Sequence, residues 1–323
     1  MNIVFFGTSS FSIIILEHLF QSPYQVAAIV TKPDQPQGRS LKLTPPPVKE
    51  WAAVNAPHIP LYQPAKASAE EFVIQMQALR PDVFVVASYG EIMKTALLNV
   101  PRLGPINVHA SLLPKWRGAA PIQRSLMAGE IETGVTIMKM VLQLDAGDML
   151  DREIVHVPLE MNHGELELAL AMAAKTPLLR TLAQLEKGTA RSTVQDPTQV
   201  TFAPKIMPEE TEIDWTRSAF QVHNQIRALA PQPGAWTWVD INGQRKKLKV
   251  KRSQIVGSDS VSTPKQTIHL TSKEWIVGCG QGHLSLLEVQ LEGKKMLPIA
   301  DFLRGFQPPL QDKLKIATIF PGL

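Results

Sequence analysis

The sequence predicts an α/β protein in two parts: a mostly parallel sheet with helices on both faces, and a smaller β-barrel after it. Up to about residue 190, short apolar runs alternate with segments of helical spacing, which is typical of a parallel sheet buried on both faces. After about residue 205, the apolar runs are separated by turn residues, which favours a barrel. A length of 323 residues also suits two domains.

The first part is predicted from five short apolar runs, two of which lead into a glycine turn. The runs are Asn2–Phe6, Val26–Val30, Val83–Ala87, Ile106–His109 and Val135–Met140. Helical spacing occurs between them, as in Phe11–Phe20, Ala69–Leu79 and Ala120–Ala128. Parallel sheets bind ligands beyond the carboxyl ends of their strands, so we expect the functional site at that edge.

A long polar segment, Lys32–Lys49, separates the second strand from the next helix and contains five prolines. Long loops in compact domains are commonly functional, and this one carries Lys32, Arg39 and Lys42. On these residues alone, two interpretations stay open. The segment is either a stiff loop that reaches a large anionic partner or a passive surface loop.

Several common sites are not predicted. The turn after the first strand has only Gly7 where a dinucleotide-binding loop carries G-x-G-x-x-G, so we expect no NAD site of the usual kind. The single cysteine, Cys279, excludes an internal disulfide and a zinc site built on several thiolates, and it fits a small buried residue in a reduced, cytoplasmic protein. The first 31 residues lack Lys and Arg, and no apolar run reaches about 18 residues, so neither a secretory signal nor a membrane span is expected.

The second part is predicted to follow a linker. Glu165–Leu185 has helical spacing that Pro177 breaks or kinks, and Gly188–Lys205 is polar and has no periodicity. Ala219–Leu229 again has helical spacing. The strand-like runs after it are Ala235–Val239, Leu248–Val250, Thr267–Leu270, Trp275–Val277 and Leu284–Leu291. They favour a small barrel of the oligonucleotide-binding type, and they divide the chain into residues 1–188, a linker at 189–205 and residues 206–323.

Positive charge is concentrated in the second part. Residues 1–204 have 17 basic and 18 acidic side chains, whereas residues 205–323 have 16 basic and 11 acidic ones. Six of the eight residues in Arg245–Arg252 are basic. This asymmetry indicates an anionic partner for the C-terminal part. The alternative is a solvated strand whose apolar Leu248 and Val250 face inward.

One segment carries residues suited to carbonyl chemistry. Asn107 and His109 alternate along the fourth predicted strand, so their side chains point to the same side. An amide can donate to an oxygen that gains negative charge, and a histidine can accept or return a proton near neutral pH. Taken alone, the pair fits a structural role equally well.

Two further segments complete the candidate site. Ser111–Pro114 follows His109 directly, and apolar side chains with exposed backbone polar groups can hold a flat heteroaromatic ligand. Asp145 follows the fifth predicted strand through a short turn, which we expect to lie at the same end of the sheet as His109. An aspartate there can orient the imidazole, although aspartates in glycine turns are often purely local features.

These residues resemble the signature of the 10-formyltetrahydrofolate-dependent formyltransferases. The string Ser111–Leu126 (SLLPKWRGAAPIQRSL), with Glu132–Thr136 (ETGVT) and Leu144–Asp148 (LDAGD), is similar to the members of this family that act on methionyl-tRNA. The N-terminal FFGT, the KPDQPQGR string, Ser88–Met93 (SYGEIM) and Ile213–Trp215 (IDW) occur in the same order. The resemblance therefore covers essentially the whole chain.

The resemblance implies a Rossmann-like catalytic domain, an OB-like C-terminal domain and catalytic roles for Asn107, His109 and Asp145. It implies 10-formyltetrahydrofolate as co-substrate and initiator methionyl-tRNA as partner. The folate site is implied at the backbone of Ser111, Leu112, Leu113 and Pro114, and more loosely at Tyr89, Gly90 and Ile92. The tRNA-contacting residues are implied in the Lys32–Lys49 insertion and in the basic strand, and are Arg39, Lys42, Arg245, Lys246, Lys247 and Lys249.

Two other functions fit some of these features. Formyltransferases that act on a small amine, such as glycinamide ribonucleotide or an amino-sugar nucleotide, share the Asn–His–Asp set. A non-catalytic RNA-binding protein would share the basic C-terminal part. The basic barrel and the proline-rich insertion favour tRNA over a small amine, and the complete set of three polar residues favours an enzyme. We therefore expect a monomeric, cytoplasmic formyltransferase with no metal and no membrane contact.

Overall fold

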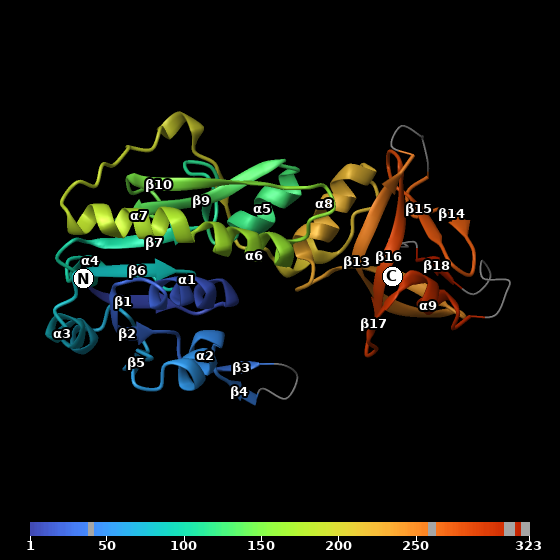
Figure 1. Ribbon diagram of the computed structural model, residues 1–323. Coiled ribbons are helices and arrows are strands. Elements are labelled where there is room, and N and C mark those ends of the chain that lie inside the picture. Colours follow the sequence, from blue (N-terminus) through green and yellow to red (C-terminus); the bar gives the residue numbers. More distant parts are fainter. Residues whose placement is uncertain (38–41, 258–262, 307–313, 318–323) are drawn as a thin grey trace. The chain divides into compact units, whose positions relative to one another are not determined.

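A computed structural model describes residues 1–37, 42–257, 263–306 and 314–317 (Figure 1). The chain folds into two compact units. The first unit comprises Met1–Pro121, Glu132–His156 and Glu167–Pro204. The second unit comprises Ile122–Ile131, Val157–Leu166 and Lys205–Leu323. Two short segments from the middle of the chain thus belong to the second unit, although no change in composition marks them in the sequence.

A seven-stranded sheet is the centre of the first unit, with its strands in the order β10, β9, β7, β6, β1, β2, β5. The strands are β1 (Asn2–Gly7), β2 (Gln25–Val30), β5 (Leu61–Tyr62), β6 (Val83–Ala87), β7 (Pro105–His109), β9 (Glu132–Lys139) and β10 (Met149–His156). All pairs from β7 to β5 are parallel, whereas β9 is antiparallel to β7 and β10 is antiparallel to β9. The prediction of a mostly parallel sheet is confirmed.

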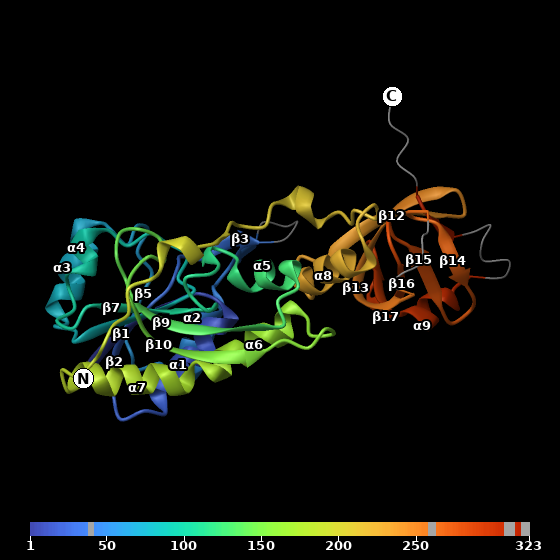
Figure 2. The ribbon, with the colours of Figure 1, turned by 90° about the horizontal axis from the view of Figure 1, so that it is seen from above.

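Helices cover both faces of this sheet. On one face, α1 (Ser10–Phe20) lies beside α7 (Lys175–Glu186) (Figure 2). On the other face, α3 (Glu70–Ala78) and α4 (Thr95–Leu98) pack on a core that includes Val4 and Phe6 of β1. The predicted break near Pro177 is confirmed: α6 (His163–Ala173) ends just before α7 begins. Pro177 lies in the first turn of α7, where a missing N–H costs no helical hydrogen bond.

The described residues of the proline-rich insertion include short strands and the start of a helix. Strand β3 (Gln35–Gln37) pairs antiparallel with β4 (Lys42–Thr44), and α2 (Pro47–Asn55) begins directly after the last prolines. The ammonium group of Lys49 contacts the carboxylate of Asp34 at 2.8 Å, which links the start of the hairpin to α2. The interpretation of the segment as one long loop is therefore too simple. Arg39 lies outside the described residues, and Lys42 is exposed at the start of β4.

The second unit contains an antiparallel, nearly closed barrel (Figure 1). Its strands follow the order β14, β15, β16, β13, β12, β18, with β17 beside β16. They are β12 (Ala235–Ile241), β13 (Gln244–Val256), β14 (Thr267–Leu270), β15 (Trp275–Gly278), β16 (His283–Leu291), β17 (Met296–Pro298) and β18 (Leu314–Ile316). The helices of this unit are α5 (Pro121–Ala128), which begins in the first unit, α8 (Ala219–Leu229) and α9 (Ile299–Leu303). The predicted barrel is confirmed.

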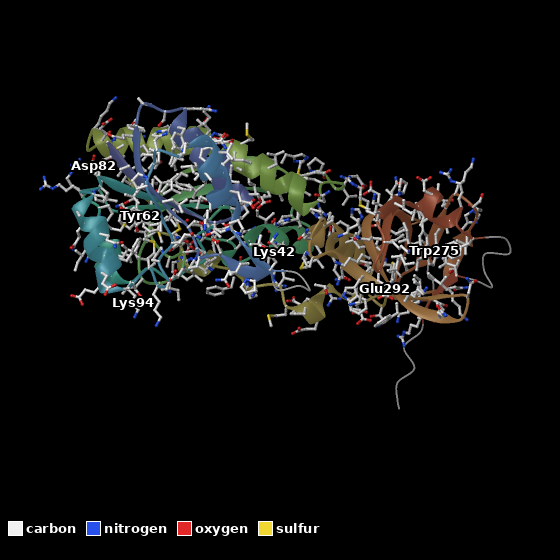
Figure 3. All side chains as sticks on the ribbon, turned by 90° about the horizontal axis from the view of Figure 1, so that it is seen from below. Lys42, Tyr62, Asp82, Lys94, Trp275 and Glu292 are labelled. Carbon is white, nitrogen blue, oxygen red and sulfur yellow. The ribbon has the colours of Figure 1, made fainter. Side chains whose placement is uncertain are left out.

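Two tryptophans fill the core of the second unit. Trp215 and Trp275 are fully buried, and Figure 3 labels Trp275 among the side chains of the barrel. The indole N–H of Trp215 donates to Thr237 Oγ1 at 3.0 Å, so its polar atom is satisfied inside the core. Cys279 is also buried, and burial raises the pKa of its thiol to about 12. This agrees with the prediction of a small buried residue.

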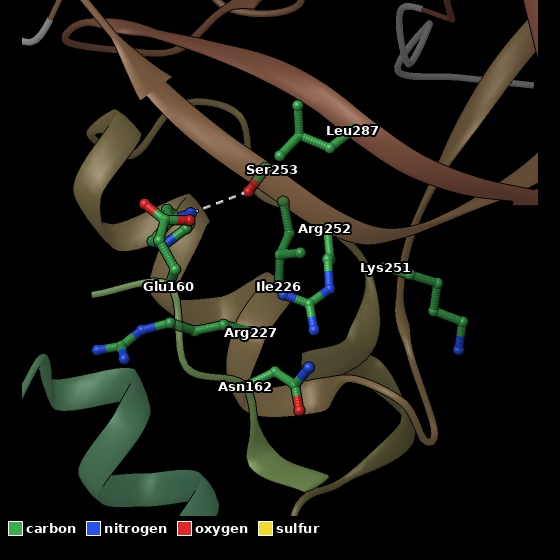
Figure 4. Close-up of a pocket in the computed structure, with 9 residues that line it drawn as sticks. Glu160, Asn162, Ile226, Arg227, Lys251, Arg252, Ser253 and Leu287 are labelled. Carbon is green, nitrogen blue, oxygen red and sulfur yellow. Dashed lines mark hydrogen bonds between the residues drawn. The ribbon is translucent and has the colours of Figure 1, made fainter. Parts of the chain in front are cut away.

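A small polar cavity of about 30 Å³ lies beside α8 and β13 in the second unit (Figure 4). Its walls include Glu160, Arg227 and Arg252. Small-molecule pockets usually enclose about 300–1,000 Å³, so this cavity is too small for a substrate. His223 forms part of its wall and donates from Nε2 to the carbonyl of Leu159 at 3.0 Å. The cavity is therefore a feature of the packing in this unit.

The buried His223 makes the stability of the second unit depend on pH. Burial lowers the pKa of His223 below its ordinary value of about 6.5, so the folded state keeps the imidazole neutral at pH values where the unfolded chain already takes up a proton. The stabilising contribution is complete above about pH 6.5 and falls as the pH is lowered towards 5. We expect the free energy of unfolding to fall over this interval, by at most about 1.4 kcal/mol per pH unit for this group.

Urea unfolding followed by tryptophan fluorescence checks this expectation, because Trp215, Trp236, Trp238 and Trp275 all lie in the second unit. His223→Gln should reduce the slope of the pH dependence between pH 7 and 5, and the part that remains comes from other histidines whose pKa is lowered by burial, such as the half-buried His163. The same substitution at the exposed His58 should leave the slope unchanged. Equal slopes for the wild type and for His223→Gln would contradict the account.

Candidate active site

Strand β7 carries two polar side chains on one face at its carboxyl end. Asn107 and His109 are two residues apart, and β7 lies between β6 and β9, where Asn107 pairs with Val86 and Met138. His109 is buried, with 5% of its side chain exposed, whereas Asn107 is half-buried. Within the described residues, the Asn107 carboxamide makes no side-chain hydrogen bond. It is therefore available to a bound molecule.

The imidazole of His109 is fixed by the loop that follows β7. Its Nε2 atom lies 3.0 Å from the carbonyl oxygen of Trp116. A carbonyl oxygen only accepts hydrogen bonds, so Nε2 carries a proton, and Nδ1 of the neutral ring is the basic nitrogen. Trp116 itself has a left-handed backbone conformation, with φ of 65°. The loop thus selects the nitrogen at which His109 can accept a proton.

Asp145 lies on the other side of the imidazole. Its Oδ2 atom is 3.7 Å from His109 Nδ1, which is too long for a hydrogen bond but close enough for attraction to a charged ring. The same Oδ2 atom accepts a hydrogen bond from the backbone N–H of Gly118 at 2.9 Å. Only 11% of the Asp145 side chain is exposed, so solvent screens this interaction weakly.

The route by which Asp145 reaches His109 differs from the sequence-based expectation. Because β9 is antiparallel to β7, Lys139 at the end of β9 pairs with Ile106 near the start of β7. The expectation that β9 ends at the same end of the sheet as His109 is therefore wrong. Residues 140–148 connect β9 to β10, and this connection carries Asp145 back to the imidazole.

Two residues that the sequence analysis did not identify support this connection. Gln195 donates from Nε2 to the carbonyl oxygens of Asp145 at 2.8 Å and Gly147 at 2.7 Å. Its Oε1 atom accepts from Nε of Arg117 at 2.9 Å. Both side chains are buried. No local pattern marks Gln195, because its partners lie 48, 50 and 78 residues away in the sequence.

The segment Ser111–Pro114 is more constrained than the sequence suggests. The hydroxyl of Thr136 on β9 donates to the carbonyl oxygen of Ser111 at 2.7 Å and accepts from the backbone N–H of Leu113 at 3.1 Å. The carbonyl oxygen of Leu112 accepts from the N–H of Lys115 at 3.1 Å. These backbone groups are thus already paired, contrary to the expectation of exposed ones. Leu112 and Pro114 are half-buried and remain accessible to a ligand.

The residues after β6 lie at the carboxyl end of the strand next to β7. The ring of Tyr89 is buried and packs edge-on against Phe6 at 5.3 Å, and burial beside Glu91 raises its pKa well above the ordinary value. Tyr89 is therefore a core residue, whose backbone can still line a site. Gly90 is exposed with φ of 75°, and Ile92 is 76% exposed. This exposed apolar side chain at the ligand-binding edge suits contact with a flat ring.

The basic residues of the barrel divide between two faces of β13. Lys249, Lys247 and Arg245 pair with Trp236, Trp238 and Asp240 of β12, so all six share one face. The Lys247 ammonium group lies 3.5 Å from the centre of the Trp236 ring, and the Arg245 guanidinium lies 5.0 Å from that of Trp238. Lys246 alternates onto the other face with the buried Leu248. We call the face that bears Trp236, Trp238, Arg245, Lys247 and Lys249 the aromatic–basic face.

The structure confirms one part of the solvated-strand interpretation, the inward position of Leu248 and Val250. Leu248 and Val250 are fully buried, as expected for a strand of a packed barrel. The outward side chains are cationic and aromatic together, which is a combination suited to phosphates and bases. Within residues 1–37, 42–257, 263–306 and 314–317, no cluster of three or more His, Cys, Asp or Glu side chains is placed to hold a metal. None of the helices in these ranges has the length and apolar character needed to span a bilayer.

Comparison with known families and proteins gives matches along the whole chain. Residues 1–182 match the family described as formyl transferase, and residues 205–307 match the formyl transferase C-terminal domain. A methionyl-tRNA formyltransferase of Protochlamydia amoebophila (strain UWE25) is 44% identical over 305 residues, which cover 94% of this chain and 95% of that protein. One of Chlamydia pneumoniae is 37% identical over 318 residues and covers 98% of both chains.

Two solved structures share the fold at low sequence identity. The crystal structure of HypX from Aquifex aeolicus in complex with tetrahydrofolic acid has a TM-score of 0.64 and 16% identity, covering 94% of this chain and 47% of HypX. The crystal structure of WlaRD, a sugar 3N-formyl transferase in the presence of dTDP and 5-N-formyl-THF, has a TM-score of 0.66 and 16% identity. It covers 91% of this chain and 99% of WlaRD.

Proposed function

The chain belongs to the formyl transferase family, and we propose that it transfers the formyl group of 10-formyltetrahydrofolate to the α-amino group of methionyl initiator tRNA. The product, N-formylmethionyl-tRNA, serves translation initiation. One observation carries the choice of substrate: the similarity to methionyl-tRNA formyltransferases at 37–44% identity extends over both parts of the chain. Similarity to the catalytic part alone would not indicate which amine accepts the formyl group.

His109 is the proposed proton carrier. An α-amine with a pKa of about 8 is mostly protonated at neutral pH and must lose a proton before its nitrogen can attack the formyl carbon. His109 Nδ1 accepts this proton, because Nε2 already donates to Trp116. The bond from the formyl carbon to the amine nitrogen forms, and the bond to the folate nitrogen breaks. His109 then returns the proton to the departing folate nitrogen. The attacking nitrogen loses its second proton to solvent, which leaves a neutral N-formyl amide.

Asp145 stabilises the charged form of His109. After proton uptake, Nε2 faces the Trp116 carbonyl and Nδ1 faces the Asp145 carboxylate, so each N–H of the imidazolium meets an oxygen. The separation of 3.7 Å shortens to a hydrogen bond when Nδ1 is protonated, since catalytic hydrogen bonds are commonly long in the free enzyme. The hydrogen bond from the Gly118 N–H keeps the carboxylate oriented.

Asn107 stabilises the formyl oxygen as it gains negative charge. Its carboxamide shares a face with His109 and is half-buried, so it can donate to an oxygen held beside the imidazole. The same role fits any formyl acceptor, which is why Asn107, His109 and Asp145 do not by themselves select tRNA. The selection of the acceptor must come from surfaces outside this group of three.

The folate co-substrate is proposed to bind at the carboxyl edge formed after β6 and β7. Ile92, Leu112 and Pro114 offer accessible apolar surface for a pterin ring, and the backbone of Gly90 is exposed two residues before Ile92. Ser111 and Leu113 contribute through packing, because their side chains are buried and Thr136 bonds the Ser111 carbonyl and the Leu113 N–H. The side chain of Tyr89 is also buried, so its contribution comes from its backbone and its packing. Such a site combines apolar contact with a few polar groups, as small-molecule sites generally do.

The tRNA is proposed to contact the aromatic–basic face and the insertion that carries Arg39 and Lys42. Lysine and arginine neutralise phosphates, and tryptophans can stack on bases or riboses. Arg245 lies over Trp238 and Lys247 over Trp236, so cations and aromatic rings occur together here, and Lys249 shares their face. Lys246, on the opposite face of β13, is the weakest of the predicted contacts. We propose that residues 1–188 carry out catalysis and that residues 206–323 bind tRNA, in a cytoplasmic monomer. Of the linker predicted at 189–205, the part up to Pro204 belongs to the first unit.

A formyl-transfer assay tests the proposed function. Purified protein is incubated with 10-formyltetrahydrofolate and methionyl initiator tRNA, and the N-formylmethionine released from the tRNA is measured by chromatography. We expect formylation that depends on both substrates, and none with uncharged tRNA. Absence of formylation under these conditions, with a known formyltransferase active in a parallel reaction, would reject the proposal.

A further inference from the structure

We propose that Gln195 is a positioning residue that holds Asp145 against His109, and that the segment Thr193–Ala203 sets the geometry on both sides of the imidazole. This inference rests on the proposed function of His109 and Asp145. The side chain of Gln195 is buried, with 5% exposed, and both the nitrogen and the oxygen of its amide form hydrogen bonds. Nε2 donates to the carbonyl oxygens of Asp145 and Gly147, and Oε1 accepts from Arg117.

The connection that carries Asp145 has little packing of its own. Val141, Leu142 and Leu144, which precede Asp145, are 47%, 64% and 65% exposed. Asp145 also has a φ of 48°, a left-handed conformation that is unfavourable for residues other than glycine and persists only when its surroundings impose it. The hydrogen bond from Gln195 to the Asp145 carbonyl oxygen acts on this strained residue itself.

Gly147 explains why the connection must be held closely. A Cβ atom at this position would lie 1.9 Å from the carbonyl oxygen of Lys139, so the connection passes against the end of β9 with no space for a side chain. The amide Nε2 of Gln195 donates to the Gly147 carbonyl oxygen at 2.7 Å and so holds the connection in this close position. A displaced Gln195 would therefore release the connection at two residues, Asp145 and Gly147.

The same segment also holds the loop on the other side of His109. The backbone N–H groups of Trp116 and Arg117 donate to Thr201, to its Oγ1 atom at 2.9 Å and to its carbonyl oxygen at 2.9 Å. Strand β11 (Phe202–Ala203) then pairs in parallel with β8 (Arg117–Gly118). The Trp116 carbonyl bonds His109 Nε2, and the Gly118 N–H bonds Asp145. Both imidazole contacts thus depend on one segment.

The Gln195→Met variant tests the inference, because methionine keeps the volume of glutamine and removes its hydrogen bonds. We expect kcat for formyl transfer to fall about 10- to 100-fold, as for a displacement of catalytic groups by about 1 Å, with the KM values for both substrates nearly unchanged. Gln199→Met is the matched control, since Gln199 lies in the same segment, is exposed and bonds only Asp196. Thermal unfolding verifies that each variant is folded.

A double-mutant cycle separates positioning from a general loss of structure. If Gln195 acts through Asp145, Gln195→Met should lower kcat in the wild-type background and change it little in the Asp145→Ala background. Equal factors in both backgrounds would overturn the inference. If Gln195→Met fails to fold, Gln195→Glu replaces it in the cycle, because it keeps the acceptor for Arg117 and removes the two donors. An active wild type with an equally active Gln195→Met rejects this inference alone, whereas an inactive wild type rejects the proposed function.

Discussion

Replacing His109 by alanine is expected to lower kcat for formyl transfer by about 10²–10⁴-fold, because the proton of the α-amine then has no acceptor in the site. Replacing Asn107 by alanine is expected to lower kcat by about 10²–10³-fold through loss of a donor to the developing oxyanion. Neither change removes apolar contacts of the folate or charges of the aromatic–basic face. The KM values for both substrates should therefore stay nearly unchanged, and steady-state kinetics with methionyl initiator tRNA measure both quantities.

The controls for these variants lie outside the candidate site. Asn99→Ala and His156→Ala change the same residue types at exposed positions and should leave kcat unaltered. Equilibrium binding of tRNA to the His109 variant should match that of the wild type. Near-normal turnover of His109→Ala would refute its role as proton carrier, and a large rise in KM without a change in kcat would assign it to binding.

Neutralising the aromatic–basic face is expected to raise the KM for tRNA by about 10- to 100-fold at low salt. The variant is the triple substitution of Arg245, Lys247 and Lys249 by glutamine. If each side chain neutralises one phosphate, the slope of log KM for tRNA against log salt concentration should fall by about 2.7. The KM for 10-formyltetrahydrofolate and the kcat at saturating tRNA should change little, because Asn107, His109 and Asp145 remain intact.

A second triple variant serves as the control, because it removes three positive charges from a different part of the barrel. Lys273, Lys294 and Lys295 are exposed in turns of the barrel, and their replacement by glutamine removes the same three charges. We expect a much smaller rise in the KM for tRNA from this variant, and a small one also from Lys246→Gln. Equal effects of both triple variants would show that only the total charge matters. An unchanged KM in the first variant would support the interpretation of β13 as a solvated strand.

The sequence predicts the classes of secondary structure well where local patterns decide them. The apolar runs at β1, β2, β6 and β7 are typical of strands that a sheet buries on both faces, and all four form such strands. By contrast, the run at β9 does not reveal whether its strand is parallel or antiparallel, because a buried strand has the same composition in either direction. The route expected for Asp145, a strand that ends beside His109, depended on that direction and was wrong, although Asp145 itself does lie 3.7 Å from the imidazole.

Other features could not be predicted because they arise from pairs of residues far apart in the sequence. Thr136 satisfies the backbone of Ser111 and Leu113 from the neighbouring strand, so the pairing is invisible until the register of β7 and β9 is known. Strand β13 is 13 residues long, whereas only Leu248–Val250 was predicted, because cations on its outward face conceal the alternation. Gln195 lies in a polar segment without periodicity, and only the folded chain places it beside Asp145.

A competition assay tests the central claim most directly. The wild-type protein is supplied with 10-formyltetrahydrofolate that carries a labelled formyl group, together with methionyl initiator tRNA, glycinamide ribonucleotide and an amino-sugar nucleotide at equal concentrations. The products are separated, and the label in each is counted. Our account predicts that the label accumulates on the α-amino group of the methionyl-tRNA. Label mainly on either small molecule, with the tRNA left unformylated, would contradict it.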